Sequence, residues 1–274
     1  MTLPQSYYSE IGKAFIDIAS RCDHGRNMYQ LKKATQKIPF CAVAKLFDEI
    51  HLTSDYTLDV CCVGNTIGGT TRLYARKCCP DKLFIGKGDQ SDGITYFVQK
   101  LAAKVEGNDS VKIKDPDNDF VYDPKTRIGG VISEKIYRKL PDYRDYITFD
   151  FNERAVWQLF LLAVIESIFP YYWHGAYLQR TYFLDKQSMI DFKTEMDDGV
   201  PRPKFTDYQY LMDTYPTVNI IDKTQAEVKV VFWNDWQGLV LNTYIATNTN
   251  GKVDFKIDKS ASKVLIEYDC QVVF

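Results

Sequence analysis

The stretch AVWQLFLLAVIESIF, residues 155–169, decides the fold class of this chain because it is almost wholly apolar. Its apolar side chains recur at helical spacing, and a helix that is apolar nearly all round lies in the centre of a protein. Asp150 and Glu153 have the spacing of an N-cap and its third helical residue, which predicts where the helix begins. Pro170 is expected to end or kink it. The polar stripe of this helix consists of Arg154, Gln158 and Glu166.

The last 58 residues, 217–274, change from the helical period to the alternation of β-strands. The expected strands cover 218–221, 227–233, 239–247, 252–258 and 263–273. In the last of them the apolar residues that alternate with polar ones are Val264, Ile266, Tyr268, Cys270 and Val272. Asn250-Gly251 is a strong signal for a tight hairpin turn. The alternation is typical of an antiparallel sheet with one face in water.

We therefore expect an α+β fold built from three parts. Residues 1–107 would form a helical and mixed N-terminal region that contains a β-hairpin, with strands at 57–63 and 70–76 around a Gly-containing loop. Residues 108–150 would form an irregular connecting region. Residues 151–274 would combine the central buried helix with the antiparallel β-sheet packed on helices. The sequence leaves open whether these parts form one continuous domain.

The composition is that of a globular protein with balanced charge. Apolar residues make up 45% and charged residues 26%, with 34 Lys and Arg against 36 Asp and Glu. Because proteins that coat nucleic acids carry a basic excess, a nucleic-acid role would rest on a local patch. The candidate patch is one strand face with Arg72, Tyr74 and Arg76, since arginines contact phosphates and a tyrosine ring stacks on bases.

We expect an intracellular, cytoplasmic protein that makes no membrane contact. The apolar stretch before Pro170 is too short to cross a bilayer. The N-terminus lacks the basic and apolar segments of a signal peptide. The seven cysteines are an odd number, and thiols stay reduced in an intracellular protein.

The aromatic residues indicate a binding role. Tyr occurs 19 times and Phe 16 times, and rings with a polar tip suit half-buried binding faces. An aromatic block after the central helix and two tryptophans at a strand end are expected to line a pocket between helix and sheet. The residues assigned to this site are Glu166, Tyr172, Trp173, His174, Trp233, Asp235 and Trp236. We therefore predict a non-catalytic binding or interaction protein with an aromatic-lined pocket or face, whose partner is an unknown protein or small molecule.

The alternative prediction is a divalent-metal-dependent hydrolase. Asp222 is followed by Glu227-Val-Lys229, and strand alternation places Glu227 and Lys229 on one face. This pattern resembles the core of the restriction-endonuclease-like nucleases. The resemblance implies that Asp222 and Glu227 hold a divalent metal, such as Mg²⁺, and that Lys229 helps to position the attacking water. The sequence leaves open whether the chain is an enzyme.

No other metal site and no cofactor are expected. Asp115, Asp117 and Asp119 resemble the start of a calcium-binding loop, but Phe120 stands where the loop needs Gly and Thr126 where it needs Glu. The cysteines include no Cys-x-x-Cys pair, the spacing typical of zinc sites.

Overall fold

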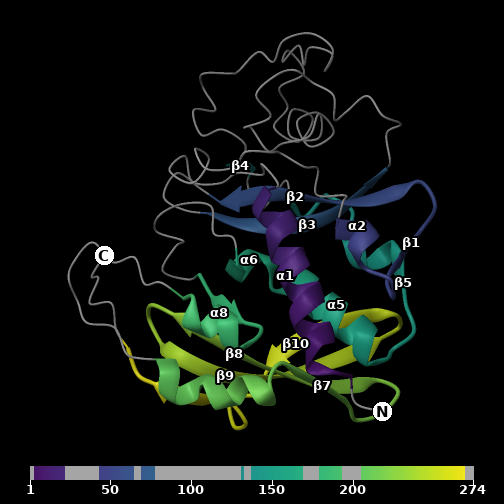
Figure 1. Cartoon of the computed structure of the whole chain (residues 1–274). Coiled ribbons are helices and arrows are strands. Elements are labelled where there is room, and N and C mark those ends of the chain that lie inside the picture. The colour runs from purple at the N-terminus through teal and green to yellow at the C-terminus, as the bar shows by residue number, and fades with distance from the viewer. Residues whose placement is uncertain are drawn as a thin grey trace, which may run out of the picture. The chain divides into compact units, whose positions relative to one another are not determined.

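The computed structural model has helices and antiparallel sheets, which confirms the predicted α+β class (Figure 1). It describes residues 3–21, 43–64, 69–77, 131–132, 137–168, 179–192 and 205–268. The chain divides into two compact units that interleave along the sequence. We call one the sheet unit, formed by Met1–Ile16, Phe149–Val164 and Tyr177–Phe274. The other is the hairpin unit, formed by Asp17–Thr148 and Ile165–Ala176.

The sheet unit is built around the long hairpin of β8 (Gln225–Asn234) and β9 (Gly238–Thr249). The edge of β8 that does not face β9 pairs with two strands in succession along its length. These are β7 (Thr217–Ile220), followed by β6 (Thr181–Phe183) nearer the β8–β9 turn. The free edge of β9 pairs in the same way with β10 and then with β11, whose bounds are Lys252–Ile257 and Lys263–Ile266. All these pairings are antiparallel, as the alternation in the sequence predicts.

The turn between β9 and β10 has the predicted two-residue form. Thr249 pairs with Lys252, so Asn250 and Gly251 are the two turn residues. Both have positive φ, 53° and 82°, which Asn and Gly adopt at lower cost than other residues. This turn confirms the Asn-Gly signal and sets the register of the β9–β10 pair.

The predicted alternation of the last strand is wrong over its described part. A register shift between Val264 and Ile266 interrupts the pairing with β9, and the strand ends at Ile266. Val264 is 46% exposed, whereas Leu265 and Ile266 both pack against the core. A bulge adds one residue to a strand and therefore changes which side chains face inward. Residues 269–273 of the expected strand lie outside the described residues.

The central helix α5 spans Glu153–Ala163, and every residue from Ala155 to Leu162 is buried. It begins two residues later than the sequence indicates. The side chain of Asn152, not of Asp150, caps it by accepting a hydrogen bond from the Ala155 amide at 2.9 Å. The helix ends before Val164, and a separate short helix, α6 (Ile165–Ile168), follows it.

Phe160 of α5 connects the helix to one face of the sheet. Its ring makes edge-on contacts with Tyr182 of β6, Tyr244 of β9 and Phe255 of β10, with centroids 6.1, 5.1 and 5.6 Å apart. Edge-to-face pairs add to the stability gained from burial, by about 0.5–1.5 kcal/mol each. One ring therefore contacts three strands of the sheet.

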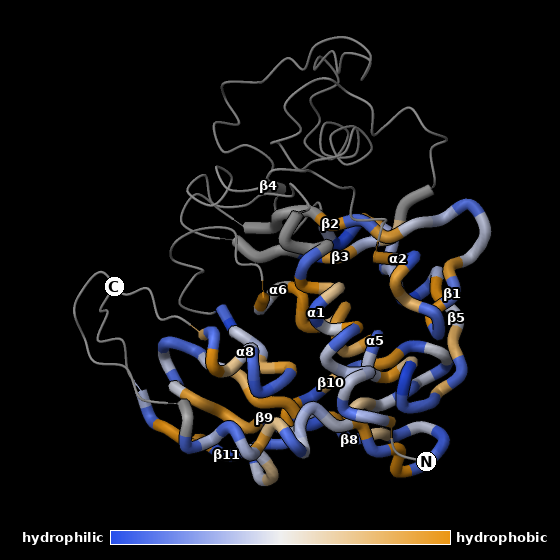
Figure 2. Tube along the Cα trace, viewed as in Figure 1, coloured by the Kyte–Doolittle hydropathy of each residue, from blue (hydrophilic) through white to orange (hydrophobic). Residues whose placement is uncertain are grey.

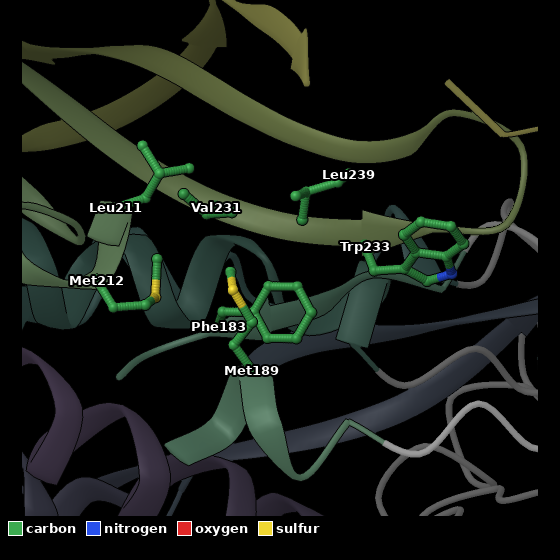
Figure 3. Packing of buried hydrophobic residues seen from close by; sticks show 7 residues of the cluster. All are labelled: Phe183, Met189, Leu211, Met212, Val231, Trp233 and Leu239. Carbon is green, nitrogen blue, oxygen red and sulfur yellow. The ribbon is translucent and has the colours of Figure 1, made fainter. Parts of the chain in front are cut away.

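The opposite face of the sheet carries a second hydrophobic cluster. It is formed with α8 (Lys186–Ile190) and η5 (Phe205–Asp213). Figure 3 shows its buried members, which are Phe183, Met189, Leu211, Met212, Val231, Trp233 and Leu239. Neighbouring strand residues point to opposite faces, so Val231 and Trp233 enter this cluster while Phe232 faces the α5 side. Hydrophobic residues accordingly dominate the trace around β9 in Figure 2.

Helix α1 (Gln5–Arg21) joins the elements of the sheet unit through its first turns. The Tyr8 ring lies edge-on to Trp157 of α5 with centroids 5.3 Å apart, and the Tyr8 hydroxyl accepts a hydrogen bond from the Val218 amide of β7 at 3.3 Å. Lys13 forms an ion pair with Asp185, which also caps α8. Contacts from one helix therefore reach α5, β7 and α8.

The hairpin unit contains the predicted β-hairpin. Strands β2 (Tyr56–Gly64) and β3 (Gly69–Lys77) pair antiparallel, and β4 (Val131–Ile132) adds to β2 in parallel. Two further strands pair with each other, β1 (His51–Leu52) and β5 (Ile147–Thr148). The remaining described elements are α2 (Val43–Leu46) and η4 (Tyr143–Asp145).

The expected segments 1–107, 108–150 and 151–274 remain a prediction. In the part of the chain that the structure describes, no helix is long and apolar enough to cross a membrane.

The burial of Tyr8 predicts a loss of stability at alkaline pH. Burial raises the pKa of Tyr8 to about 12 because it disfavours the phenolate, although the Val218 amide opposes this and Glu153 adds to it. An unfolded tyrosine titrates near pH 10. The contribution of Tyr8 to stability is therefore full below pH 10 and is lost as the pH rises towards 12.

We expect Tyr8→Phe to weaken this alkaline decline and to cost about 1–2 kcal/mol at neutral pH, because the buried Val218 amide loses its acceptor. Urea unfolding at neutral and alkaline pH measures both effects. Tyr210→Phe, which removes a hydroxyl from an exposed ring, is the control. A decline in Tyr8→Phe as steep as in the wild type would contradict the assignment.

Candidate functional site: the turn between β8 and β9

The turn between β8 and β9 is fixed by hydrogen bonds of Asn234. The side-chain oxygen of Asn234 accepts from the Trp236 amide at 3.0 Å, and its carbonyl oxygen accepts from the Gln237 amide at 3.2 Å. The side-chain nitrogen of Asn234 donates to the Gln179 carbonyl at 2.9 Å, just before β6. Asn234 is buried, so these bonds are shielded from competing water.

Gly238 fixes the other end of the turn. Its φ is +87°, a conformation that residues with a Cβ rarely adopt. A Cβ at this position would collide with the Ile266 carbonyl oxygen and would lie 2.8 Å from the Tyr268 amide nitrogen. The turn is therefore packed directly against the chain that leaves β11, and glycine is required for this approach.

Trp233 and Asp235 have different roles although both were assigned to one binding site. Trp233 is 2% exposed, and its ring lies 5.0 Å from that of Tyr268 within the core cluster. The indole Nε1 of Trp233 donates to Oδ1 of Asp235 at 2.6 Å. A hydrogen bond to a carboxylate is stronger than a neutral one. Trp233 thus packs in the core cluster and, through its indole N–H, orients the Asp235 carboxylate in the turn.

Among the predicted site residues whose side chains the structure describes, Trp236 is the most exposed. It is 37% exposed, although its own amide is held by Asn234. The strand residues just before the turn, Val231, Phe232 and Trp233, are buried apolar side chains. The structure therefore presents a large aromatic side chain on a backbone that is fixed by hydrogen bonds and by the close approach at Gly238.

The structure does not describe the side chains of the other predicted site residues. Glu166 belongs to α6, and its side chain is outside the description. Tyr172, Trp173 and His174 also lie outside the described residues. Their participation in the aromatic site remains a prediction.

Sequence reasoning missed a polar network on the α5 side of the sheet. Arg180 donates from Nη1 to the Tyr244 hydroxyl at 2.8 Å, and the Asn242 side chain donates to the same hydroxyl at 3.4 Å. The Arg180 guanidinium also lies 4.8 Å from the centre of the Phe232 ring. Strand pairing brings these residues together from β9 and from the residue before β6, so local sequence carries no signal for them. The network satisfies polar groups that would otherwise be buried at a cost.

The predicted nucleic-acid face on β3, formed by Arg72, Tyr74 and Arg76, is wrong at its tyrosine. Tyr74 is 1% exposed, so its ring cannot stack on a base. The Arg72 guanidinium lies 5.8 Å from the centre of the Tyr137 ring. The backbone of Arg76 follows the predicted strand, but its side chain is outside the description. Burial of the central tyrosine is the physical reason for this correction.

The three residues of the nuclease-like pattern have local partners. Asp222 forms the β7–β8 turn, because its Oδ1 accepts from the Thr224 and Gln225 amides and the Thr224 hydroxyl. These bonds to the charged form hold the pKa of Asp222 below its usual value. Glu227 and Lys229 lie on one strand face, as alternation predicts, and form an ion pair at 2.7 Å.

Metal-ligand geometry gives no further support to the hydrolase alternative. Within the described residues, no group of three or more His, Cys, Asp or Glu side chains is placed to hold a metal ion. The acidic loop that begins at Asp115 lies outside the described residues. The alternative site of Asp222, Glu227 and Lys229 remains a prediction.

Comparisons of this chain with protein-family models, with curated protein sequences and with solved structures give no match. The assignment of a function therefore rests on the geometry of the chain itself.

The hydrolase alternative makes a sharp prediction. Glu227→Ala and Lys229→Ala should each abolish Mg²⁺-dependent DNA cleavage, because each removes a member of the proposed metal and water site. Each should change the free energy of unfolding by less than about 1 kcal/mol, since a partly exposed ion pair contributes little. A plasmid-nicking assay with urea unfolding of the same samples measures both. DNA cleavage that survives in both variants would remove the alternative.

Proposed function

We propose that this chain is a non-catalytic binding protein and that the turn between β8 and β9 is part of its binding face. The observation that carries the proposal is the exposed Trp236 ring on a turn whose backbone is held at both ends. The partner is a protein or a small molecule that contacts this ring.

Two physical arguments support Trp236 as a binding residue. Tryptophan is among the residues that contribute most to binding when an interface covers them. A side chain presented by a fixed backbone also loses less conformational freedom on binding than one on a mobile loop. Asn234 and Gly238 provide that fixed backbone here.

A second exposed aromatic residue provides an internal comparison. Tyr210, in η5, is 63% exposed, more than Trp236. Exposed apolar residues that stand singly are common on protein surfaces and need no function. Trp236 differs because the side chain of buried Asn234 accepts a hydrogen bond from its amide. The preceding residue in the turn, Asp235, is also held, by a hydrogen bond from the Trp233 indole.

We expect Trp236→Ala to reduce partner capture at least about tenfold, the loss typical of an interface residue whose removal costs more than 1.4 kcal/mol. Immobilised wild-type and variant proteins would be exposed to the same cell extract, and the bound species quantified by mass spectrometry. Tyr210→Ala removes a more exposed ring from another element and is the matched control.

The outcome is decided by the species that the wild type and Tyr210→Ala both retain. Their loss from Trp236→Ala, with an unchanged unfolding midpoint, would support the proposal. Equal retention by Trp236→Ala would exclude the turn as a binding face.

A further inference from the structure

We infer that the first turns of α1 cap the outer edge of β7 and prevent two copies of this chain from pairing through that edge. When the cap is lost, a second copy adds its own β7 to the sheet. This surface is formed by residues other than those of the β8–β9 turn, so it is independent of the function proposed there.

One edge of β7 pairs with β8, and the other edge faces α1. In an antiparallel pair, alternate residues exchange backbone hydrogen bonds with the neighbouring strand, and the residues between them point their backbone groups the other way. The Ile221 amide donates to the Gln225 carbonyl of β8 at 2.9 Å. The alternate residues Pro216, Val218 and Ile220 therefore direct their backbone groups away from β8, to the outer edge.

Two side chains of α1 bond to this outer edge. Nε2 of Gln5 donates to the Pro216 carbonyl oxygen at 3.0 Å, and the Tyr8 hydroxyl accepts from the Val218 amide at 3.3 Å. Gln5 and Tyr8 are at positions i and i+3 of the helix and so lie on one face of it. They supply a donor and an acceptor to alternate strand residues, as a neighbouring β-strand would do.

The following turns of α1 anchor the cap beside the next strand on the same edge of β8. A Cβ at Gly12 would lie 2.8 Å from Cδ1 of Leu184, so the helix packs directly on the residue that follows β6. Lys13 forms its ion pair with Asp185, one residue further on. Because β6 and β7 pair with successive parts of β8, α1 covers the edge where these two strands meet (Figure 1).

The side chains of β7 do not themselves oppose the approach of another strand. Its four residues, Thr-Val-Asn-Ile, are all uncharged. On the β9 side of the sheet, by contrast, β10 carries the exposed Lys256 and β11 the exposed Lys263. Exposed lysines are one means of preventing edge-to-edge association, and a covering helix is another. The helix is the means that protects β7.

An uncapped β7 fits a second β7 in a symmetric register centred on Val218. Across a two-fold axis, Val218 and the partner's Val218 exchange backbone hydrogen bonds in both directions. Each Ile220 amide then donates to the Pro216 carbonyl of the other copy, so the missing N–H of proline is not needed. Two-fold pairing is favoured for identical chains because one surface serves both partners.

Sedimentation velocity over a series of protein concentrations tests the inference with the double variant Gln5→Ala/Tyr8→Phe, which removes both cap bonds. We expect its self-association constant to exceed that of the wild type at least about tenfold, because pairing satisfies backbone groups that the cap no longer bonds. Gln5→Ala alone should show the same change to a smaller degree. Glu10→Ala, which shortens an exposed side chain on α1, is the matched control and should behave as the wild type.

Amide hydrogen exchange of the same samples locates the contact. In the dilute double variant the Val218 amide should exchange faster than in the wild type, and its protection should return when the protein is concentrated. Urea unfolding establishes that each variant is folded. Unchanged self-association in both Gln5→Ala and the double variant, with cooperative unfolding retained, would overturn the inference.

Two further changes within β7 ask whether this strand makes the contact. Ile220→Pro, added to the double variant, removes an amide that the symmetric register uses and that points away from β8. Asn219→Lys, added instead, places a charge at an exposed position of β7 and sets like charges near each other in the pair. Each should return self-association to within roughly twofold of the wild type. Association that persists undiminished in both would show that the copies meet elsewhere and would reject the β7 edge.

Discussion

The sheet unit depends on one constraint, which is that the part of the β8–β9 hairpin next to its turn, residues 230–234 and 238–240, is buried on both faces. Phe160 of α5 covers one face by contacting three strands, and the cluster around Phe183 and Met189 covers the other. A strand covered on both sides must place apolar residues at successive positions, as Val230 to Trp233 do. The same constraint explains why the turn at the end of this hairpin is held so firmly.

The position of surface residues at the β8–β9 turn depends on the packing of this core. Trp233 belongs to the core cluster and also bonds to Asp235, so the packing of the core and the position of a surface carboxylate are linked through one side chain. Trp236 follows directly, on a backbone that Asn234 and Gly238 define. The candidate binding face is therefore an extension of the sheet rather than a loop added to it.

The sequence predicts those parts of the fold that depend on short-range periodicity. The apolar run in α5, the Asn250-Gly251 turn and the alternation along the first half of β8, up to Val230, each reflect residues close in the chain. The cap of α5 was misplaced because Asp150 and Asn152 are both good capping residues and only backbone geometry selects one. The site was predicted as one aromatic group because sequence does not show that Trp233 is buried and Trp236 exposed. The Arg180–Tyr244 contact joins residues that only strand pairing brings together.

The interleaving of the two units constrains how the chain is made. The sheet unit takes the first turns of α1, up to Ile16, from the start of the chain and its strands from residues after 177. On the ribosome, the first turns of α1 emerge long before their partners Val218 and Asp185. Synthesis must therefore run past the whole stretch from Asp17 to Thr148 before the earliest helix can find its native contacts. Assembly of this unit is a late event, completed only when its last strands leave the exit tunnel.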